Sequence, residues 1–142
     1  MNVILGVGNE LMGDDGIGPS IARKFEGRPG LFAAATAAPE NFIRKVQELR
    51  PEILVIVDCA NFGGRAGEHR MIKNNEITGL ALSTHNTPLT LFLKAVHGHA
   101  GKIFIVGVQP KAVGFAEQMS REVSGSTSSI VWFLENLLKN GK

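Results

Sequence analysis

The first 19 residues combine a strand, a glycine-rich loop and the start of a helix: from Met1 to Pro19 they read MNVILGVGNELMGDDGIGP. Val3–Val7 is short, apolar and rich in β-branched residues, which is typical of a parallel strand covered on both faces. Pro19 suits the first turn of a helix, where its missing N–H group costs nothing. The segment therefore predicts a strand–loop–helix unit whose loop lies at the carboxyl end of a buried strand.

The remainder of the chain continues the alternation of strand and helix. Apolar runs predict four more strands, two of them strong (Ile53–Val57 and Ile103–Val108) and two weaker (Leu31–Ala35 and His69–Ile72). Helical spacing of apolar residues predicts three more helices, over Glu40–Leu49, from an N-cap at Thr87 to Val96, and from about Ser126 to Asn140. This order predicts an α/β protein with a three-layer α/β/α architecture, a twisted, mostly parallel central sheet of about five strands, and right-handed crossovers.

Length and composition limit the possible classes of protein. The 142 residues suit a single domain, 1–142, and 15 basic against 13 acidic residues give no charge pattern typical of nucleic-acid binding. No apolar run approaches the roughly 20 residues of a membrane helix. The first ten residues contain no basic leader, and Cys59 is the only cysteine, so no internal disulfide can form. We expect a cytoplasmic monomer without membrane insertion.

The loop after the first strand does not fit nucleotide binding. Gly6 and Gly8 begin a dinucleotide-binding pattern, but Leu11 stands in place of its third glycine, and no lysine follows a glycine as in a phosphate-binding loop. Asp14 and Asp15 would also repel a phosphate. The loop favours a cation or acid–base chemistry, with Asp15 pointing inward and Asp14 capping the helix that follows, although both aspartates could simply belong to a capped turn.

Two further polar residues are predicted at the same edge of the sheet as Asp15. Asp58 follows the central apolar run, and His85 lies in the polar loop Ser83–Thr87 that opens a helix. Carboxylate and imidazole ligands suit borderline divalent ions such as Ni²⁺ or Zn²⁺, with a position left open for water or substrate. The alternatives are that Asp58 caps a loop and His85 is a solvated loop residue. Cys59 is interpreted as a buried thiol on the opposite face of the strand from Asp58.

Several blocks of sequence, taken together, resemble the hydrogenase maturation endopeptidases. The N-terminal block is Gly6–Asn9 followed by Gly13–Pro19. Further blocks follow in order at Ala38–Asn41, Ile56–Asp58, Thr84–Leu89, Gly107–Pro110 and Val113–Phe115. The later blocks are most similar to the branch that serves the formate-hydrogenlyase type of nickel–iron hydrogenase. The resemblance implies the same three-layer fold and a metal-contacting set at Asp15, Asp58 and His85.

The resemblance also implies an activity. Family members cleave the C-terminal extension from the precursor of the hydrogenase large subunit after nickel insertion, and the nickel is carried by the substrate and is not resident in the enzyme. They are often classed with aspartic proteases, so Asp15, Asp58 and His85 are the expected catalytic residues. One alternative is a non-proteolytic nickel checkpoint or carrier protein with the same three residues. A small-molecule hydrolase or nucleotide-binding protein is disfavoured by the glycine pattern.

Overall fold

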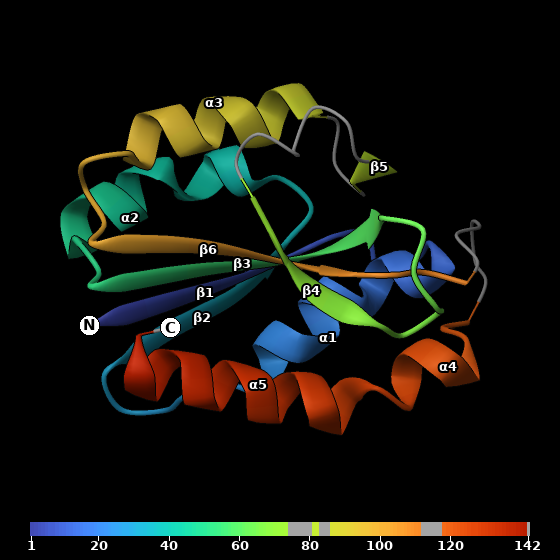
Figure 1. Ribbon diagram of the computed structural model, residues 1–142. Helices are drawn as coiled ribbons and strands as arrows, with labels where there is room; N and C mark the ends of the chain where they lie inside the picture. The colour runs from blue at the N-terminus through green and yellow to red at the C-terminus, as the bar shows by residue number, and fades with distance from the viewer. Residues whose placement is uncertain (74–80, 83–85, 112–117, 142) are drawn as a thin grey trace.

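A mostly parallel sheet forms the centre of the computed structural model, which describes residues 1–73, 81–82, 86–111 and 118–141 (Figure 1). The strands are β1 (Asn2–Val7), β2 (Leu31–Thr36), β3 (Ile53–Asn61), β4 (His69–Ile72), β5 (Ala81–Leu82) and β6 (Lys102–Val108). Their order is β2-β1-β3-β6-β4, with β5 pairing beside the end of β3. The first four strands of this order are mutually parallel, whereas β4 and β5 are antiparallel to their neighbours. The predicted mostly parallel sheet is confirmed.

Helices cover both faces of this sheet, which gives the predicted three layers. The helices are α1 (Ile17–Arg23), α2 (Ile43–Leu49), α3 (Asn86–Val96), α4 (Arg121–Ser124) and α5 (Thr127–Asn140). Figure 1 shows α2 and α3 on one face and α1, α4 and α5 on the other. The predicted N-terminal boundary of α5 at Ser126 is correct, and Gly141 ends the helix in a left-handed conformation.

The hydrophobic core is divided between the two faces because side chains alternate along each strand. Val55, Val57 and Cys59 of β3 pack with α1 and α5, whereas Leu54 and Ile56 pack with α2 and α3. Each fully buried valine, leucine or isoleucine contributes roughly 1.5–3 kcal/mol of transfer free energy. By the same alternation, Asp58 faces the α2–α3 layer, opposite Cys59 as predicted.

A glycine in α1 allows this helix to lie directly against the sheet. A Cβ atom at Gly18 would overlap the carbonyl oxygens of Val7 in β1 and Val57 in β3. This close approach is the role that the third glycine has in dinucleotide-binding loops. Here Leu11, at that glycine's position, is 63% exposed, and Gly18 supplies the helix–strand contact instead.

Several predicted element boundaries were wrong by a few residues. β3 was expected to end at Val57 but continues to Asn61, because Cys59 pairs with β6 and Ala60 with β5. Asp58 therefore lies within the strand and not beyond it. The helix predicted from Glu40 is divided into a 3₁₀ turn, Pro39–Phe42, and α2.

The helix starts also differ from the expected ones. A 3₁₀ turn, Gly13–Gly16, leads into α1, which begins two residues before Pro19, so that Pro19 lies in the first turn as predicted but is its third residue. α3 begins at Asn86, one residue before the predicted N-cap at Thr87. The short helix α4 was not predicted, since it has only four residues and too few apolar positions for a periodic pattern.

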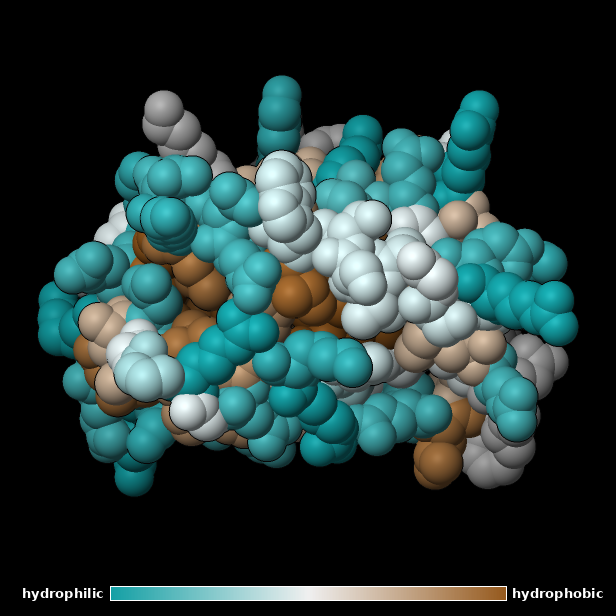
Figure 2. Space-filling view, turned by 90° about the horizontal axis from the view of Figure 1, so that it is seen from below, coloured by the Kyte–Doolittle hydropathy of each residue, from teal (hydrophilic) through white to brown (hydrophobic). Residues whose placement is uncertain are grey.

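The face covered by α5 is largely hydrophilic on its outside. Ile130, Leu134 and Leu137 are buried against the sheet, and Figure 2 shows mainly hydrophilic side chains on this side, with apolar ones visible in the gaps between them. Within the part of the chain that the structure describes, no helix combines the length and hydropathy needed to cross a membrane.

Candidate functional site

The sheet order places a topological switch point between β1 and β3. After β1 the chain forms β2 on one side of it, and β3 then pairs on the other side. In open parallel sheets, ligands bind in the crevice beyond the carboxyl ends of the strands at such a point. The loop that follows β1 carries Asp14 and Asp15, and the second half of β3 carries Asp58. All three carboxylates thus belong to the segments that form this crevice.

Asp15 lies in the 3₁₀ turn Gly13–Gly16 and points inward, as predicted. Its side chain is 5% exposed, and its Oδ2 atom accepts a hydrogen bond from the backbone N–H of Asn9 at 2.9 Å. The Asn9 side chain in turn accepts the N–H of Leu11 at 2.9 Å, which shapes the loop as an Asx turn. The loop is therefore closed on itself through Asp15, and the carboxylate has a fixed position.

Asp58 is fully buried within β3. It lies opposite Val7 of β1 and Gly107 of β6, and its Oδ1 atom accepts the backbone N–H of Cys59 at 2.8 Å. Removing a carboxylate from water is costly unless hydrogen bonds or a cation compensate. A charged side chain at this place in a buried strand therefore indicates a role beyond packing.

The Cys59 thiol is buried in the core, on the opposite face of β3 from Asp58. Burial raises the pKa of this thiol first, and the negative charges of Asp58, Asp15 and Asp14 raise it further. A raised pKa keeps the sulfur protonated and unreactive. Cys59 is therefore a buried, protonated thiol in the core, as predicted.

The third predicted ligand, His85, lies outside the described residues. It immediately precedes α3, the helix on the face of the sheet toward which Asp58 points. Among residues 1–73, 81–82, 86–111 and 118–141, no group of three or more histidine, cysteine, aspartate or glutamate side chains is placed to hold a metal ion. A shared metal site of Asp15, Asp58 and His85 stays a prediction.

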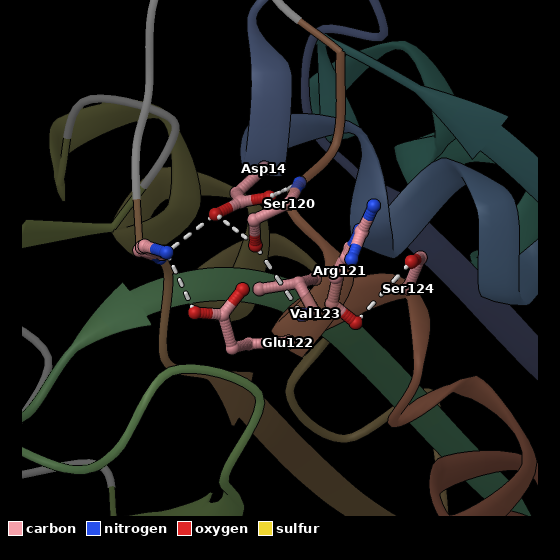
Figure 3. Close-up of polar contacts among 7 residues, drawn as sticks. Asp14, Ser120, Arg121, Glu122, Val123 and Ser124 are labelled. Atoms are coloured by element: carbon pink, nitrogen blue, oxygen red, sulfur yellow. Dashed lines mark hydrogen bonds and ion pairs between the residues drawn. The ribbon is translucent and has the colours of Figure 1, made fainter.

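Asp14 does not cap the helix that follows it, contrary to the prediction. Its fully buried carboxylate accepts the backbone N–H of Lys111 at 2.7 Å and the backbone N–H of Ser120 at 2.7 Å (Figure 3). The Ser120 hydroxyl donates to it as well, at 3.0 Å. Neither the 3₁₀ turn nor α1 has a side-chain N-cap. Asp14 instead connects the loop after β1 to Lys111, which follows β6, and to Ser120, which precedes α4.

Gln109 is a second organising residue that sequence reasoning did not identify. Its side chain is buried after β6, where its carbonyl oxygen accepts the N–H groups of Phe62 at 2.9 Å and Gly64 at 3.1 Å. Its amide group donates to the side chain of Asn61 at 3.1 Å. Gln109 thereby fixes the chain that leaves the end of β3. The signals in the sequence are that Gln109 is a polar residue directly after a buried strand and that it belongs to the block Gly107–Pro110.

Comparison with known proteins identifies the family. Residues 23–136 match the family described as hydrogenase maturation protease. The chain belongs to this family. It is 35% identical to the hydrogenase 3 maturation protease of Escherichia coli (strain K12), over 99% of this chain and 92% of that protein. A putative hydrogenase maturation protease of Methanocaldococcus jannaschii is 32% identical, over 99% of this chain and 89% of that protein.

Solved structures of hydrogenase maturation proteases show the same fold. The solution structure of the endopeptidase HycI from Escherichia coli has a TM-score of 0.83 and 34% identity, and covers 99% of this chain and 93% of its own. The crystal structure of a [NiFe] hydrogenase maturation protease HycI from Thermococcus kodakarensis has a TM-score of 0.83 and 28% identity, and covers 98% of this chain and 92% of its own. The predicted family and enzyme class, a protease, are confirmed. The alignment with the Escherichia coli protease includes almost the whole chain and thus extends beyond the matched range 23–136.

Proposed function

We propose that this hydrogenase maturation protease removes the C-terminal extension from the precursor of a nickel–iron hydrogenase large subunit after nickel has been inserted. The observation that carries the proposal is the pair of buried carboxylates, Asp15 and Asp58, at the switch point of a chain that aligns over 99% of its length with a hydrogenase 3 maturation protease. The relative gives the class of substrate. The two buried carboxylates support the proposal that the substrate is cut at this edge of the sheet.

Nickel enters this proposal as part of the substrate. Asp15 and Asp58 supply oxygen ligands and His85 a nitrogen ligand, and this mixture suits a borderline divalent ion. Three ligands from the protease leave coordination positions for the groups of the precursor that already hold the nickel. Recognition of the loaded precursor then requires that both proteins contribute ligands to the same nickel ion. A precursor without nickel lacks the ion that joins the two proteins.

The same side chains also have the chemistry for peptide hydrolysis. Cleavage needs a group that takes a proton from the attacking water and a group that returns a proton to the leaving amine. A carboxylate pair can perform both steps, which supports an aspartic type of catalysis by Asp15 and Asp58, and His85 is the third candidate. Each aspartate accepts a backbone hydrogen bond that keeps its orientation fixed before the substrate arrives, from Asn9 to Asp15 and from Cys59 to Asp58.

We further propose that the protein acts as a cytoplasmic monomer. A single polypeptide supplies all three candidate residues, so the proposed site does not require a second copy. The proposed substrate is a whole protein, so we expect the site to be an open crevice at the sheet edge and not a deep pocket.

The experiment that tests the function mixes the purified protein with nickel-loaded and nickel-free large-subunit precursor and measures intact masses. The proposal predicts loss of one defined C-terminal peptide from the loaded precursor alone. Cleavage of both forms would contradict the nickel requirement. Stable binding to the loaded precursor without any loss of mass would overturn the protease assignment and support a nickel-sensing checkpoint or carrier protein instead.

A further inference from the structure

The Asp14 carboxylate joins its own turn to two places that lie 97 and 106 residues later in the sequence. It belongs to the 3₁₀ turn that also carries Asp15, and it accepts the N–H groups of Lys111, 97 residues later, and Ser120, 106 residues later. Lys111 follows the end of β6, and Ser120 is the N-cap of α4, with its hydroxyl accepting the N–H of Val123. One buried charge thus ties the chain after β6 and the start of α4 to the turn beside the predicted site (Figure 3).

The segment that Asp14 anchors lines a surface hollow next to that turn. Gln118 and Met119, directly before Ser120, line one part of the hollow, and the chain from the loop after β1 to the C-cap of α1 lines the rest, through Glu10, Gly13, Gly16, Ser20, Arg23 and Lys24. The methyl carbon of Met119 would lie 3.8 Å from a Cβ atom at Gly16, so the two sides are in contact range at one point. The position of Ser120 therefore sets the distance between the two sides of this hollow.

We infer that Asp14 is a positioning residue of the protease: it holds Ser120 so that Gln118 and Met119 form a fixed wall of the hollow next to the turn that carries Asp15, and the precursor lies against this wall. This inference rests on the proposed function for the identity of the substrate. Asp14 does not act on the scissile bond, because both of its oxygens already accept hydrogen bonds from the protein. Hydrogen bonds from backbone N–H groups to a buried carboxylate are about twice as strong as neutral ones, which suits an anchor.

The test uses Asp14→Asn, which keeps the shape of the side chain. An amide has one acceptor oxygen, and its NH₂ group would face the N–H of either Lys111 or Ser120, so one donor loses its partner. We expect amide hydrogen exchange at the donor that loses its partner, Lys111 or Ser120, to accelerate about tenfold or more relative to the wild type. We also expect KM for the nickel-loaded precursor to rise about tenfold while kcat falls less than about threefold, because the wall contacts the substrate and not the reacting atoms.

Two further variants make the comparison specific. Ser120→Ala removes the hydroxyl that donates to Asp14 and leaves the backbone contacts, so we expect a smaller increase in KM of the same kind. Glu122→Gln is the matched control, since it weakens the exposed ion pair between Lys111 Nζ and Glu122 Oε2 (2.7 Å), which links the same two places without Asp14. We expect the control to leave exchange and kinetics unchanged.

Each possible result decides the inference. Unchanged exchange at Lys111 and Ser120 in Asp14→Asn would overturn the anchor, and unchanged KM despite faster exchange would overturn the positioning role. A loss of kcat at constant KM would overturn it in favour of direct catalysis by Asp14. If Asp14→Asn does not fold, Ser120→Ala carries the same comparison. If the wild type binds the precursor without cutting it, the proposed function fails. The criterion for the positioning role of Asp14 is then a roughly tenfold increase in the dissociation constant of Asp14→Asn for the precursor, in place of the increase in KM.

Discussion

Gly8 and Asp15 are in direct backbone contact: a Cβ atom at Gly8 would overlap the carbonyl oxygen of Asp15. Gly8 also has a φ of 151°, a backbone conformation that residues other than glycine rarely adopt. The loop after β1 therefore returns to its own first residue and brings Asp15 against the end of the strand. The absence of a side chain at Gly8 is what permits this path.

Gly8→Ala is therefore expected to destabilise the protein and to displace Asp15. We expect a loss of about 2–4 kcal/mol in the free energy of unfolding, since backbone strain and steric overlap add at one site. Urea unfolding gives the change in stability, and the precursor assay gives the activity of the folded protein. We expect that activity to fall even where the variant is fully folded.

Gly27→Ala is the matched control for this substitution. Gly27 also has a positive φ, 80°, but a Cβ atom there would meet nothing within 4 Å. We expect only the conformational cost, about 1–2 kcal/mol, and unchanged cleavage. Equal losses for the two variants would show that the contact with Asp15 is not what constrains Gly8.

The Gln109 side chain holds the chain beyond β3, and its removal should loosen that chain. Gln109→Leu keeps a side chain of similar size but leaves the N–H groups of Phe62 and Gly64 without their acceptor. We expect a loss of about 2–3 kcal/mol in unfolding free energy, measured by urea titration. Gln109→Glu retains acceptor oxygens for both N–H groups and should lose less. A larger loss for Gln109→Glu than for Gln109→Leu would contradict this account of the contact.

The strands that form the sheet could be predicted because a strand that is buried on both faces consists of an uninterrupted run of apolar residues. Three strong runs and two weak ones correspond to β1, β3, β6, β2 and β4. The extension of β3 from Val57 to Asn61 could not be predicted in this way. It depends on pairing with β6 and β5, which are distant in the sequence, and not on the small and polar residues of the extension itself.

The candidate site was predictable to the same limited extent. The burial of Asp58 was expected because a carboxylate at the end of an apolar strand needs a compensating partner, and the inward orientation of Asp15 was expected from the acidic loop after the first strand. The roles of Asp14 and Gln109 were missed, because their hydrogen-bond partners lie 45 to 106 residues away and nothing in the local pattern indicates them. A short polar side chain near a helix start predicts a cap by default, and Asp14 has a long-range partner instead.

The buried Cys59 thiol predicts how stability depends on pH. Its pKa is raised in the folded protein by burial and then by Asp58, Asp15 and Asp14, whereas in the unfolded chain it is about 8.5. The unfolded state therefore releases a proton above that pH and the folded state does not, so stability falls as pH rises. We expect a decrease of up to about 1.4 kcal/mol per pH unit between about pH 8.5 and 9.5, from urea unfolding.

Cys59→Ala is the control for this dependence, because it removes the titrating group and should flatten the decrease. The wild-type thiol should also resist alkylation by iodoacetamide until the protein is unfolded. Rapid alkylation of the folded protein, or the same pH dependence in Cys59→Ala, would contradict the assignment of a buried, protonated thiol.

The most direct test of the account is the intact mass of nickel-loaded large-subunit precursor after incubation with the wild-type protein, Asp15→Asn, Asp58→Asn or His85→Ala. The account predicts loss of a single C-terminal peptide with the wild type and cleavage rates at least about 100-fold lower with each variant, provided that thermal unfolding shows the variant to be folded. Full-length precursor after incubation with the wild type, or wild-type cleavage by Asp58→Asn, would contradict it.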